Sequence, residues 1–253
     1  QTTNKWQNSE IEGIDIMLAI DVSTSMLAED LKPNRLEAAK DVAAEFINGR
    51  PNDNIGITLF AGETFTQCPL TVDHAVLLDM IHNIKCGLIT DGTAVGMGIA
   101  NAVTRLKDSK AKSKVIILLT DGTNNKGDIS PMTAAEIAKS FGIRVYTIGV
   151  GTNGMAPYPY PVGNTVQYVS MPVEIDEKTL TEIAGTTDGN YFRATSNSKL
   201  KEVYEEIDKL EKTKLNVKEY SKRDEEYHWF ALAAFLCVLL EVLLRNSVLK
   251  KIP

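Results

Sequence analysis

Residues 14–25 read IDIMLAIDVSTS, and this stretch decides the fold because an apolar run meets three closely spaced polar side chains. The apolar run is typical of a strand buried on both faces inside a parallel sheet. Asp21, Ser23 and Ser25 begin where that strand should end, and open α/β sheets bind ligands at the carboxyl ends of their strands. One carboxylate and two hydroxyls are hard oxygen donors, which suit a small divalent cation such as Mg²⁺.

The rest of the chain alternates apolar strand runs with segments whose apolar residues recur at helical spacing. Segment 64–68 follows strand 55–61 after only Gly62-Glu63, which fits a hairpin and an antiparallel edge strand. We therefore predict an α/β fold with a doubly wound, mostly parallel central sheet, one antiparallel edge strand and helices on both faces. The predicted strands are 14–20, 55–61, 115–119, 143–150 and 190–194, and the predicted helices are 35–47, 73–84, 94–106, 133–141, 176–184 and 198–210.

Two more polar residues fall on the same predicted face. Thr93 stands at the start of helix 94–106, and Asp121 follows strand 115–119 in a Thr-Asp-Gly turn. Each alone has an ordinary explanation, because Asp, Ser and Thr are common N-cap and turn residues. Their convergence with the first motif indicates a single cation site.

These positions jointly resemble the metal-ion-dependent adhesion site (MIDAS) of von Willebrand factor type A (VWA) domains, in that family's order. The resemblance covers roughly residues 10–212. It implies that Mg²⁺ or Mn²⁺ binds directly or through water, and that an acidic side chain of a protein partner takes an open coordination position. The implied ligands are Asp21, Ser23, Ser25, Thr93 and Asp121.

The stretches SKVIILLTDGTNN at 113–125 and GIRVYTIGVGT at 142–152, together with an apolar C-terminal segment, resemble the Bat-type bacterial aerotolerance proteins. Members of that family are membrane-anchored, carry further spans before the domain and are encoded beside MoxR-type AAA+ ATPases. The resemblance implies a stress or aerotolerance complex at the bacterial inner membrane, with other membrane proteins of the same system as further partners.

The C-terminal segment WFALAAFLCVLLEVLL, residues 229–244, is apolar except for Glu241. Its length is also compatible with a buried helix, but the segment has no polar stripe, so we predict a transmembrane helix. Positive charges after the span place the domain in the periplasm, whereas the Lys and Arg residues of 209–223 favour a cytoplasmic domain. The predicted organisation is an N-terminal segment 1–12, a VWA domain 13–212, a charged stalk 213–227, a transmembrane helix 228–249 and a tail 250–253.

Other functional classes fit less well. The net charge of −6 and the lack of a basic cluster argue against nucleic acid as a partner. GVGTNG at 149–154 matches a dinucleotide fingerprint, but three prolines in the following MAPYPYP forbid the helix that such a site requires. A surface hairpin or loop is the better prediction for this segment.

An enzyme is the main rival to a binding protein. A haloacid dehalogenase-type phosphatase also places an aspartate after a buried strand, but it needs a second acid two residues later, where this chain has Ser23. No nucleophile has a base near it in sequence, so we expect no catalysis. A structural membrane scaffold without functional metal binding is the other alternative. Cys68 and Cys86 are either free thiols or a disulfide pair.

Overall fold

A computed structural model describes residues 13–163, 165–221, 232 and 238. Its centre is a six-stranded sheet in the order β3-β2-β1-β4-β5-β8. All neighbours in this sheet are parallel except β2 and β3, which form an antiparallel hairpin at one edge. The predicted fold class is therefore confirmed for the central sheet. The strands are β1 (Asp15–Asp21), β2 (Asn54–Phe60), β3 (Thr64–Thr71), β4 (Lys114–Thr120), β5 (Arg144–Val150) and β8 (Tyr191–Ala194).

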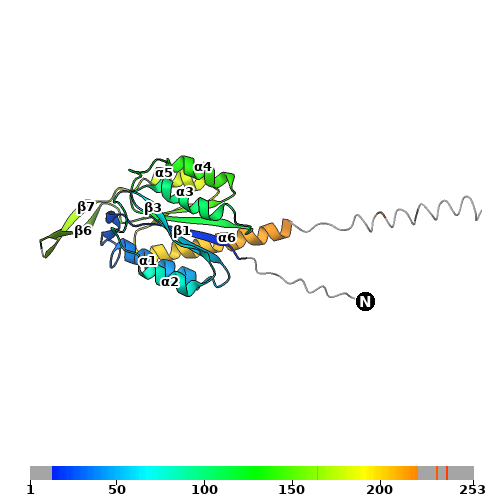
Figure 1. Cartoon of the computed structure of the whole chain (residues 1–253), viewed down its shortest axis with the longest axis horizontal. Helices are drawn as coiled ribbons and strands as arrows, with labels where there is room; N and C mark the ends of the chain where they lie inside the picture. The colour runs from blue at the N-terminus through cyan, green and yellow to red at the C-terminus, as the bar shows by residue number, and fades with distance from the viewer. Residues whose placement is uncertain (1–12, 164, 222–231, 233–237, 239–253) are drawn as a thin grey trace, which may run out of the picture. The chain divides into compact units, whose positions relative to one another are not determined.

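Helices cover both faces of the sheet (Figure 1). One face carries α3 (Val95–Leu106), α4 (Pro131–Ser140) and α5 (Glu177–Thr186), and the other carries α1 (Arg35–Asn48), α2 (His74–His82) and the first part of α6 (Asn197–Ser221). Two of these helices begin with a side-chain N-cap. The side chain of Asn34 accepts a hydrogen bond from the backbone of Glu37 at 2.8 Å, and that of Asp73 accepts one from Val76 at 3.2 Å.

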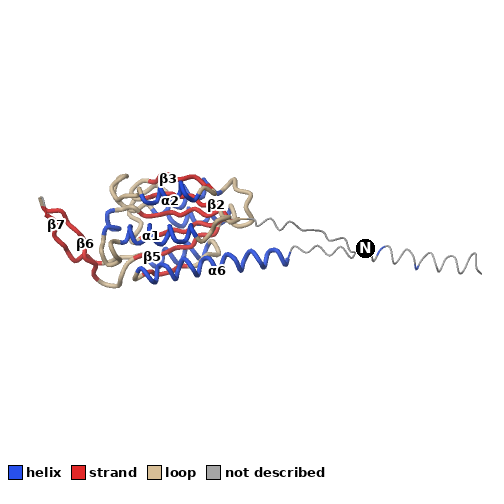
Figure 2. Tube along the Cα trace, turned by 90° about the horizontal axis from the view of Figure 1, so that it is seen from below, coloured by secondary structure: helices blue, strands red, loops and turns tan. Residues whose placement is uncertain are grey.

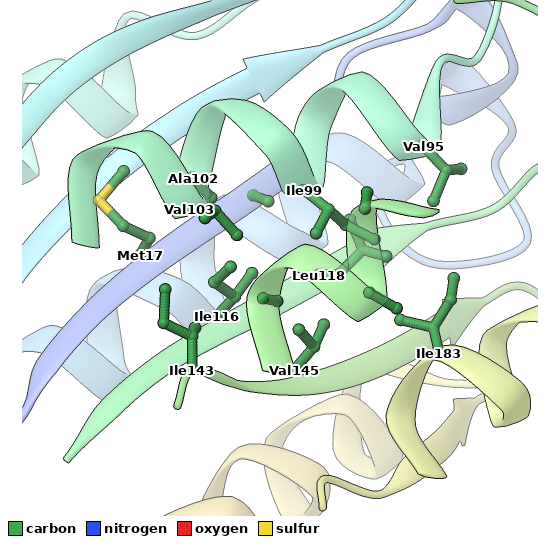
Figure 3. Close-up of a cluster of buried hydrophobic side chains, with 14 of the residues drawn as sticks. Met17, Val95, Ile99, Ala102, Val103, Ile116, Leu118, Ile143, Val145 and Ile183 are labelled. Carbon is green, nitrogen blue, oxygen red and sulfur yellow. The ribbon is translucent and has the colours of Figure 1, made fainter. Parts of the chain in front are cut away.

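A hydrophobic cluster fills the space between the sheet and helices α3, α4 and α5 (Figure 3). It combines Met17 of β1, Ile116 and Leu118 of β4 and Val145 of β5 with Ile99 of α3. Side chains of a strand alternate between its faces, so the intervening apolar residues of β1 are buried against the other helical layer. This two-sided burial explains why the central strands have almost no polar side chains.

The bounds of α4 and α6 differ from the prediction for identifiable reasons. Helix α4 begins at Pro131, because Ser130 caps it by accepting a hydrogen bond from Thr133 at 3.1 Å and proline fits the first helical position. Helix α6 continues to Ser221, past the predicted end at residue 210, and no proline or glycine interrupts that sequence. Compact packing extends to Glu211, and a second unit begins at Lys212.

Glu211 holds α6 against the amino ends of two strands. Its buried carboxylate accepts hydrogen bonds from the hydroxyls of Tyr146 at 2.5 Å and Ser113 at 2.8 Å, and it pairs with Arg144. Burial raises the pKa of Glu211, but these donors outweigh the effect and keep the pKa below its usual range. This cluster lies at the end of the sheet opposite the carboxyl ends of β1 and β4.

A second, two-stranded sheet follows β5. Strands β6 (Met155–Val162) and β7 (Thr165–Pro172) form an antiparallel hairpin that projects from the domain (Figure 2). The prediction of a hairpin in the proline-rich segment is confirmed, and the dinucleotide site is excluded by its conformation, because a strand and not a helix follows the glycines.

The predicted transmembrane helix 228–249 lies outside the described residues, apart from Leu232 and Val238. Among the residues that the structure describes, no helix combines the length and the hydrophobicity that a membrane crossing requires.

The core makes a direct prediction about stability. Leu118→Ala removes a fully buried side chain from the central strand β4 and should lower the free energy of unfolding by roughly 2–5 kcal/mol. Leu88→Ala is the matched control, because Leu88 is 52% exposed and its loss should change stability by less than about 0.5 kcal/mol. Urea unfolding measures both values, and equal effects would contradict the assigned core.

Candidate metal centre

Two carboxylates meet at the carboxyl ends of adjacent strands. β1 ends at Asp21, and Asp121 follows directly after β4. The two strands are parallel neighbours with Ile20 opposite Leu119, and the chain leaves them in opposite directions along the sheet. This is the topological switch point at which open α/β sheets bind ligands. Both carboxylates are buried.

Asp21 accepts one protein hydrogen bond on each oxygen. The backbone N–H of Ser23 donates to Oδ1 at 2.9 Å, and the hydroxyl of Thr120 donates to Oδ2 at 2.6 Å. A carboxylate has about four acceptor positions, so capacity for a cation remains. Burial, followed by the negative charge of Asp121, raises the pKa of Asp21 to about 7. The site therefore favours neutralisation of the Asp21 carboxylate, either by a proton or by a bound cation.

The two serines complete a continuous polar cluster with Asp121. They lie at the start of the short helix η1 (Thr24–Leu27), which turns the chain back over the strand ends. The hydroxyl oxygens of Ser23 and Ser25 are 2.9 Å apart, and Ser25 donates to Oδ1 of Asp121 at 2.7 Å. Ser23 is buried and Ser25 is exposed, so the cluster opens to solvent at Ser25.

Thr93 approaches the same cluster from a third loop. A Cβ at Gly122, the residue after Asp121, would lie 3.2 Å from the Thr93 hydroxyl oxygen. The backbone carbonyl of Thr93 accepts hydrogen bonds from the N–H groups of Asn125 and Lys126, at 2.9 and 3.2 Å. The side chain of Asn125 in turn accepts from the N–H of Thr93 at 2.9 Å. The structure thus brings all five predicted ligands to one end of the sheet.

Asp91 ties the loop of Thr93 to the loop of the serines. Its carboxylate accepts hydrogen bonds from the backbone N–H of Thr24 at 3.0 Å and from the Thr24 hydroxyl at 2.8 Å. Partial burial raises the pKa of Asp91, but these donors outweigh it and the pKa falls below its usual range. Asp91 is therefore an ionised clamp between two segments that are 67 residues apart in sequence.

A buried arginine adds a positive charge beside the cluster. Arg35 donates to Oδ2 of Asp121 at 2.7 Å and makes a bidentate pair with Asp30, with both contacts at 2.7 Å. Burial raises the pKa of Asp121, and the Arg35 guanidinium opposes this effect without cancelling it. When Asp21, Asp30 and Asp121 are all ionised, they and the Arg35 guanidinium carry a formal charge of −2, which a divalent cation would balance.

The donor set suits a small hard cation. Across the described residues, no three side chains of His, Cys, Asp or Glu come together to hold a metal ion. A cation at the strand ends would therefore depend on two carboxylates, hydroxyls and water, and these are the oxygen donors that Mg²⁺ and Mn²⁺ accept. The residues present fit the group that the resemblance implies.

Cys86 also lies at the cluster. Its thiol donates to the backbone carbonyl of Ser23 at 3.4 Å, and burial followed by the charges of Asp21 and Asp121 raises its pKa to about 12. Both Cys86 and Cys68 are free thiols, so the disulfide alternative is not formed.

Comparison with known proteins decides the family. Residues 15–206 match the model of the von Willebrand factor type A domain. The chain belongs to this family. The VWA domain occupies most of the described chain and includes every residue of the candidate metal centre.

Two solved structures of Bat-type proteins are similar to this VWA domain. BatB from Bacteroides thetaiotaomicron is 34% identical, with a TM-score of 0.69 over 79% of this chain and all of that one. An aerotolerance-related membrane protein from Bacteroides fragilis is also 34% identical, with a TM-score of 0.67 over 78% of this chain and all of that one. Both the VWA fold and the resemblance to Bat-type proteins are thus confirmed.

Two further relatives extend the comparison. A UPF0353 protein from Mycolicibacterium paratuberculosis is 32% identical over 203 residues, which cover 75% of this chain and 58% of that protein. Proximal thread matrix protein 1 from the mussel byssus, solved with zinc in its MIDAS motif, is 25% identical, with a TM-score of 0.62 over 78% of this chain and 45% of that one. The chain spans little more than half the length of the UPF0353 protein and less than half the length of the mussel protein.

Several residues of the centre were missed by sequence reasoning. Asp91 stands in the polar Thr-Asp-Gly-Thr junction before the helix, so its position carried a signal of turn chemistry but not of a partner. Thr120 belongs to the predicted Thr-Asp-Gly turn, but nothing in the sequence indicated its hydrogen bond to Asp21. Asp30, Arg35 and Cys86 carried no signal, because their roles depend on contacts with distant segments.

The raised pKa of Asp21 predicts an unusual pH dependence in the absence of divalent cations. The folded pKa of about 7 exceeds the ordinary value near 4, so the folded state holds a proton that the unfolded state has already released. Stability should fall as pH rises between these values, by up to about 1 kcal/mol per pH unit. Thermal unfolding in EDTA from pH 5 to 8 measures this slope.

Asp21→Asn should reduce the slope, since the amide does not titrate. Asp30 and Asp91 have lowered pKa values, so the stability they contribute is lost only below about pH 4 and does not affect this range. An identical slope in the native protein and Asp21→Asn would contradict the assignment.

Proposed function

We propose that this VWA domain binds a protein partner through a divalent cation held by Asp21, Ser23, Ser25, Thr93 and Asp121. The observation that carries the proposal is the pair of buried carboxylates, Asp21 and Asp121, in a cluster whose hydroxyl groups open to solvent at Ser25. Mg²⁺ or Mn²⁺ would neutralise the cluster, and an acidic side chain of the partner would complete the coordination from the exposed side.

The residues after Asp21 favour binding over turnover. A phosphatase of the haloacid dehalogenase type would need a second acid two residues later to handle the leaving-group proton, and that residue here is Ser23. Turnover of para-nitrophenyl phosphate that Asp21→Asn abolishes would support this rival.

The similarity to Bat-type proteins suggests the setting. The partner would belong to a bacterial stress or aerotolerance complex that works with a MoxR-type AAA+ ATPase, and other membrane proteins of that system would be further partners. We expect residues 228–249 to anchor the chain in the inner membrane, with the VWA domain in the periplasm. The alternative orientation places the domain in the cytoplasm.

Metal binding should stabilise the folded domain, because only the folded state holds the ligands together. At a cation concentration about 100 times Kd the gain is about 2.7 kcal/mol, which corresponds to a rise in Tm of roughly 5–10 °C. Asp21→Asn should abolish the rise without lowering the Tm of the metal-free protein, since it removes a buried charge. Differential scanning calorimetry with and without Mg²⁺ or Mn²⁺ measures both effects.

Asp79→Asn is the matched control, because Asp79 is exposed on α2 and lies outside the cluster. This variant should keep the full rise in Tm on addition of Mg²⁺ or Mn²⁺. The absence of any shift in the native protein at millimolar cation would refute the metal centre and would favour a structural scaffold.

Partner binding should depend on the cation. Affinity purification from cells that make the full-length protein should recover a partner in Mg²⁺ and lose it in EDTA, and Asp121→Asn should reproduce the loss. Asp79→Asn should retain the partner. A partner recovered equally well in EDTA would mean that recognition does not run through the metal.

A further inference from the structure

The projecting hairpin of β6 and β7 has an unusual surface. The sequence has no Asp, Glu, Lys or Arg between Gly151 and Val173. Seven of the fourteen large hydrophobic side chains that are exposed in the described residues belong to this hairpin, so the apolar surface is concentrated there. These seven are Met155, Tyr160, Val162, Val166, Tyr168, Val169 and Met171.

The two edges of the hairpin differ in their hydrogen-bonding groups. The carbonyl of Pro157 accepts a hydrogen bond from the backbone of Glu29 at 2.8 Å, so Pro157 directs its polar backbone group away from β7. Alternate residues of a strand direct their backbone N–H and carbonyl groups to the same side, so the carbonyl groups of Pro159 and Pro161 also point toward this outer edge. Proline has no N–H, and the outer edge of β6 is therefore a poor template for another strand.

The outer edge of β7 keeps its donors. Val166, Tyr168 and Ser170 lie opposite Pro161, Pro159 and Pro157, so their N–H and carbonyl groups also point outward. Within the described part of the chain, β6 is the only strand paired with β7. This edge is a row of alternating donors and acceptors that an incoming strand can pair with.

We propose that the outer edge of β7 is a docking strand for an extended, uncharged segment of a protein partner. Such a segment would pair with the backbone of Val166, Tyr168 and Ser170, and the apolar residues beside it would cover the exposed side chains of the hairpin. This surface goes beyond the proposed metal function, because the pairing requires no cation.

A protein fits this surface better than a bilayer or a second copy of the chain. The outward N–H and carbonyl groups of β7 would lose their hydrogen bonds to water in hydrocarbon. The hairpin also has no Lys or Arg that could contact anionic lipid headgroups. If the β7 strands of two copies paired with each other, the backbone groups at both β7 edges would be hydrogen-bonded. This pairing would leave the apolar side chains on the two faces of each hairpin uncovered, because Val166 and Tyr168 lie on one face and Val169 and Met171 on the other.

Contacts at its base and in the middle of β7 hold the hairpin in a defined position. At the base, Asp30 accepts a hydrogen bond from the backbone N–H of Thr152 at 2.8 Å, and in the middle of β7 the hydroxyl of Tyr168 donates to Glu29 at 3.0 Å. Asp30 is also the residue that pairs with Arg35 beside the metal centre. Because the strand is already ordered, docking requires little loss of conformational entropy, which favours affinity.

The test uses the full-length protein in its own host, with the photo-cross-linking residue p-benzoylphenylalanine in place of Val166. Ser170→Pro removes one outward N–H, and the proline ring blocks an incoming strand while an edge position tolerates it. Ser170→Thr is the matched control, because it keeps the donor. The yield of one protein adduct should fall by about tenfold in Ser170→Pro and stay within about twofold in Ser170→Thr.

Tyr168→Pro against Tyr168→Phe is a second pair that blocks the same edge at another residue, and it should give the same contrast. The proposal is supported by a protein adduct whose yield falls in each proline variant and stays in its matched control. The adduct should also persist in EDTA, which distinguishes this surface from the metal centre. Adducts that are insensitive to both prolines, adducts with lipid only, adducts with a second copy only, or no adduct at all would each overturn the proposal.

Discussion

Two buried carboxylates at the ends of neighbouring strands are the constraint on which the rest of this structure depends. Asp21 and Asp121 carry like charges in a region that excludes water, where an unpaired charge is unfavourable. Hydrogen-bond donors stabilise the two carboxylates. They are the N–H of Ser23, the hydroxyls of Thr120 and Ser25, and the buried guanidinium of Arg35. These contacts do not cancel the effect of burial on either carboxylate, and the proposed cation would supply the missing positive charge.

The sheet topology explains why the charges meet there. Parallel neighbours β1 and β4 bring their carboxyl ends to the same edge, and the chain leaves them toward opposite sides of the sheet, which is the arrangement at which open α/β sheets bind ligands. The loop of Thr93 lies against the end of β2, where the N–H of Gly62 donates to the carbonyl of Thr90 and the N–H of Ala94 donates to the carbonyl of Ala61. Asp91 then fixes that loop to the serines. Hydrogen bonds among three loops therefore hold the candidate ligands in place.

One chain of contacts joins the metal centre to the projecting hairpin. Asp121 pairs with Arg35, Arg35 pairs with Asp30, and Asp30 accepts the backbone N–H of Thr152 at the base of β6. The candidate metal centre is charged and the hairpin has an uncharged strand edge, so the two proposed surfaces would recognise different chemistry. Both lie on loops that follow the carboxyl ends of strands of the central sheet.

The sequence by itself determined the elements and the ligand types. Apolar runs and helical spacing identified the strands and helices, and Asp21, Ser23, Ser25, Thr93 and Asp121 were predicted because strand ends and helix starts follow local patterns. Only the tertiary structure decided which side chains pair. The salt bridge of a helical arginine to the second carboxylate, the thiol beside the serines and the open edge of β7 depend on burial and on contacts between distant segments. Local sequence patterns do not encode these, because desolvation and partner geometry arise only when the layers pack.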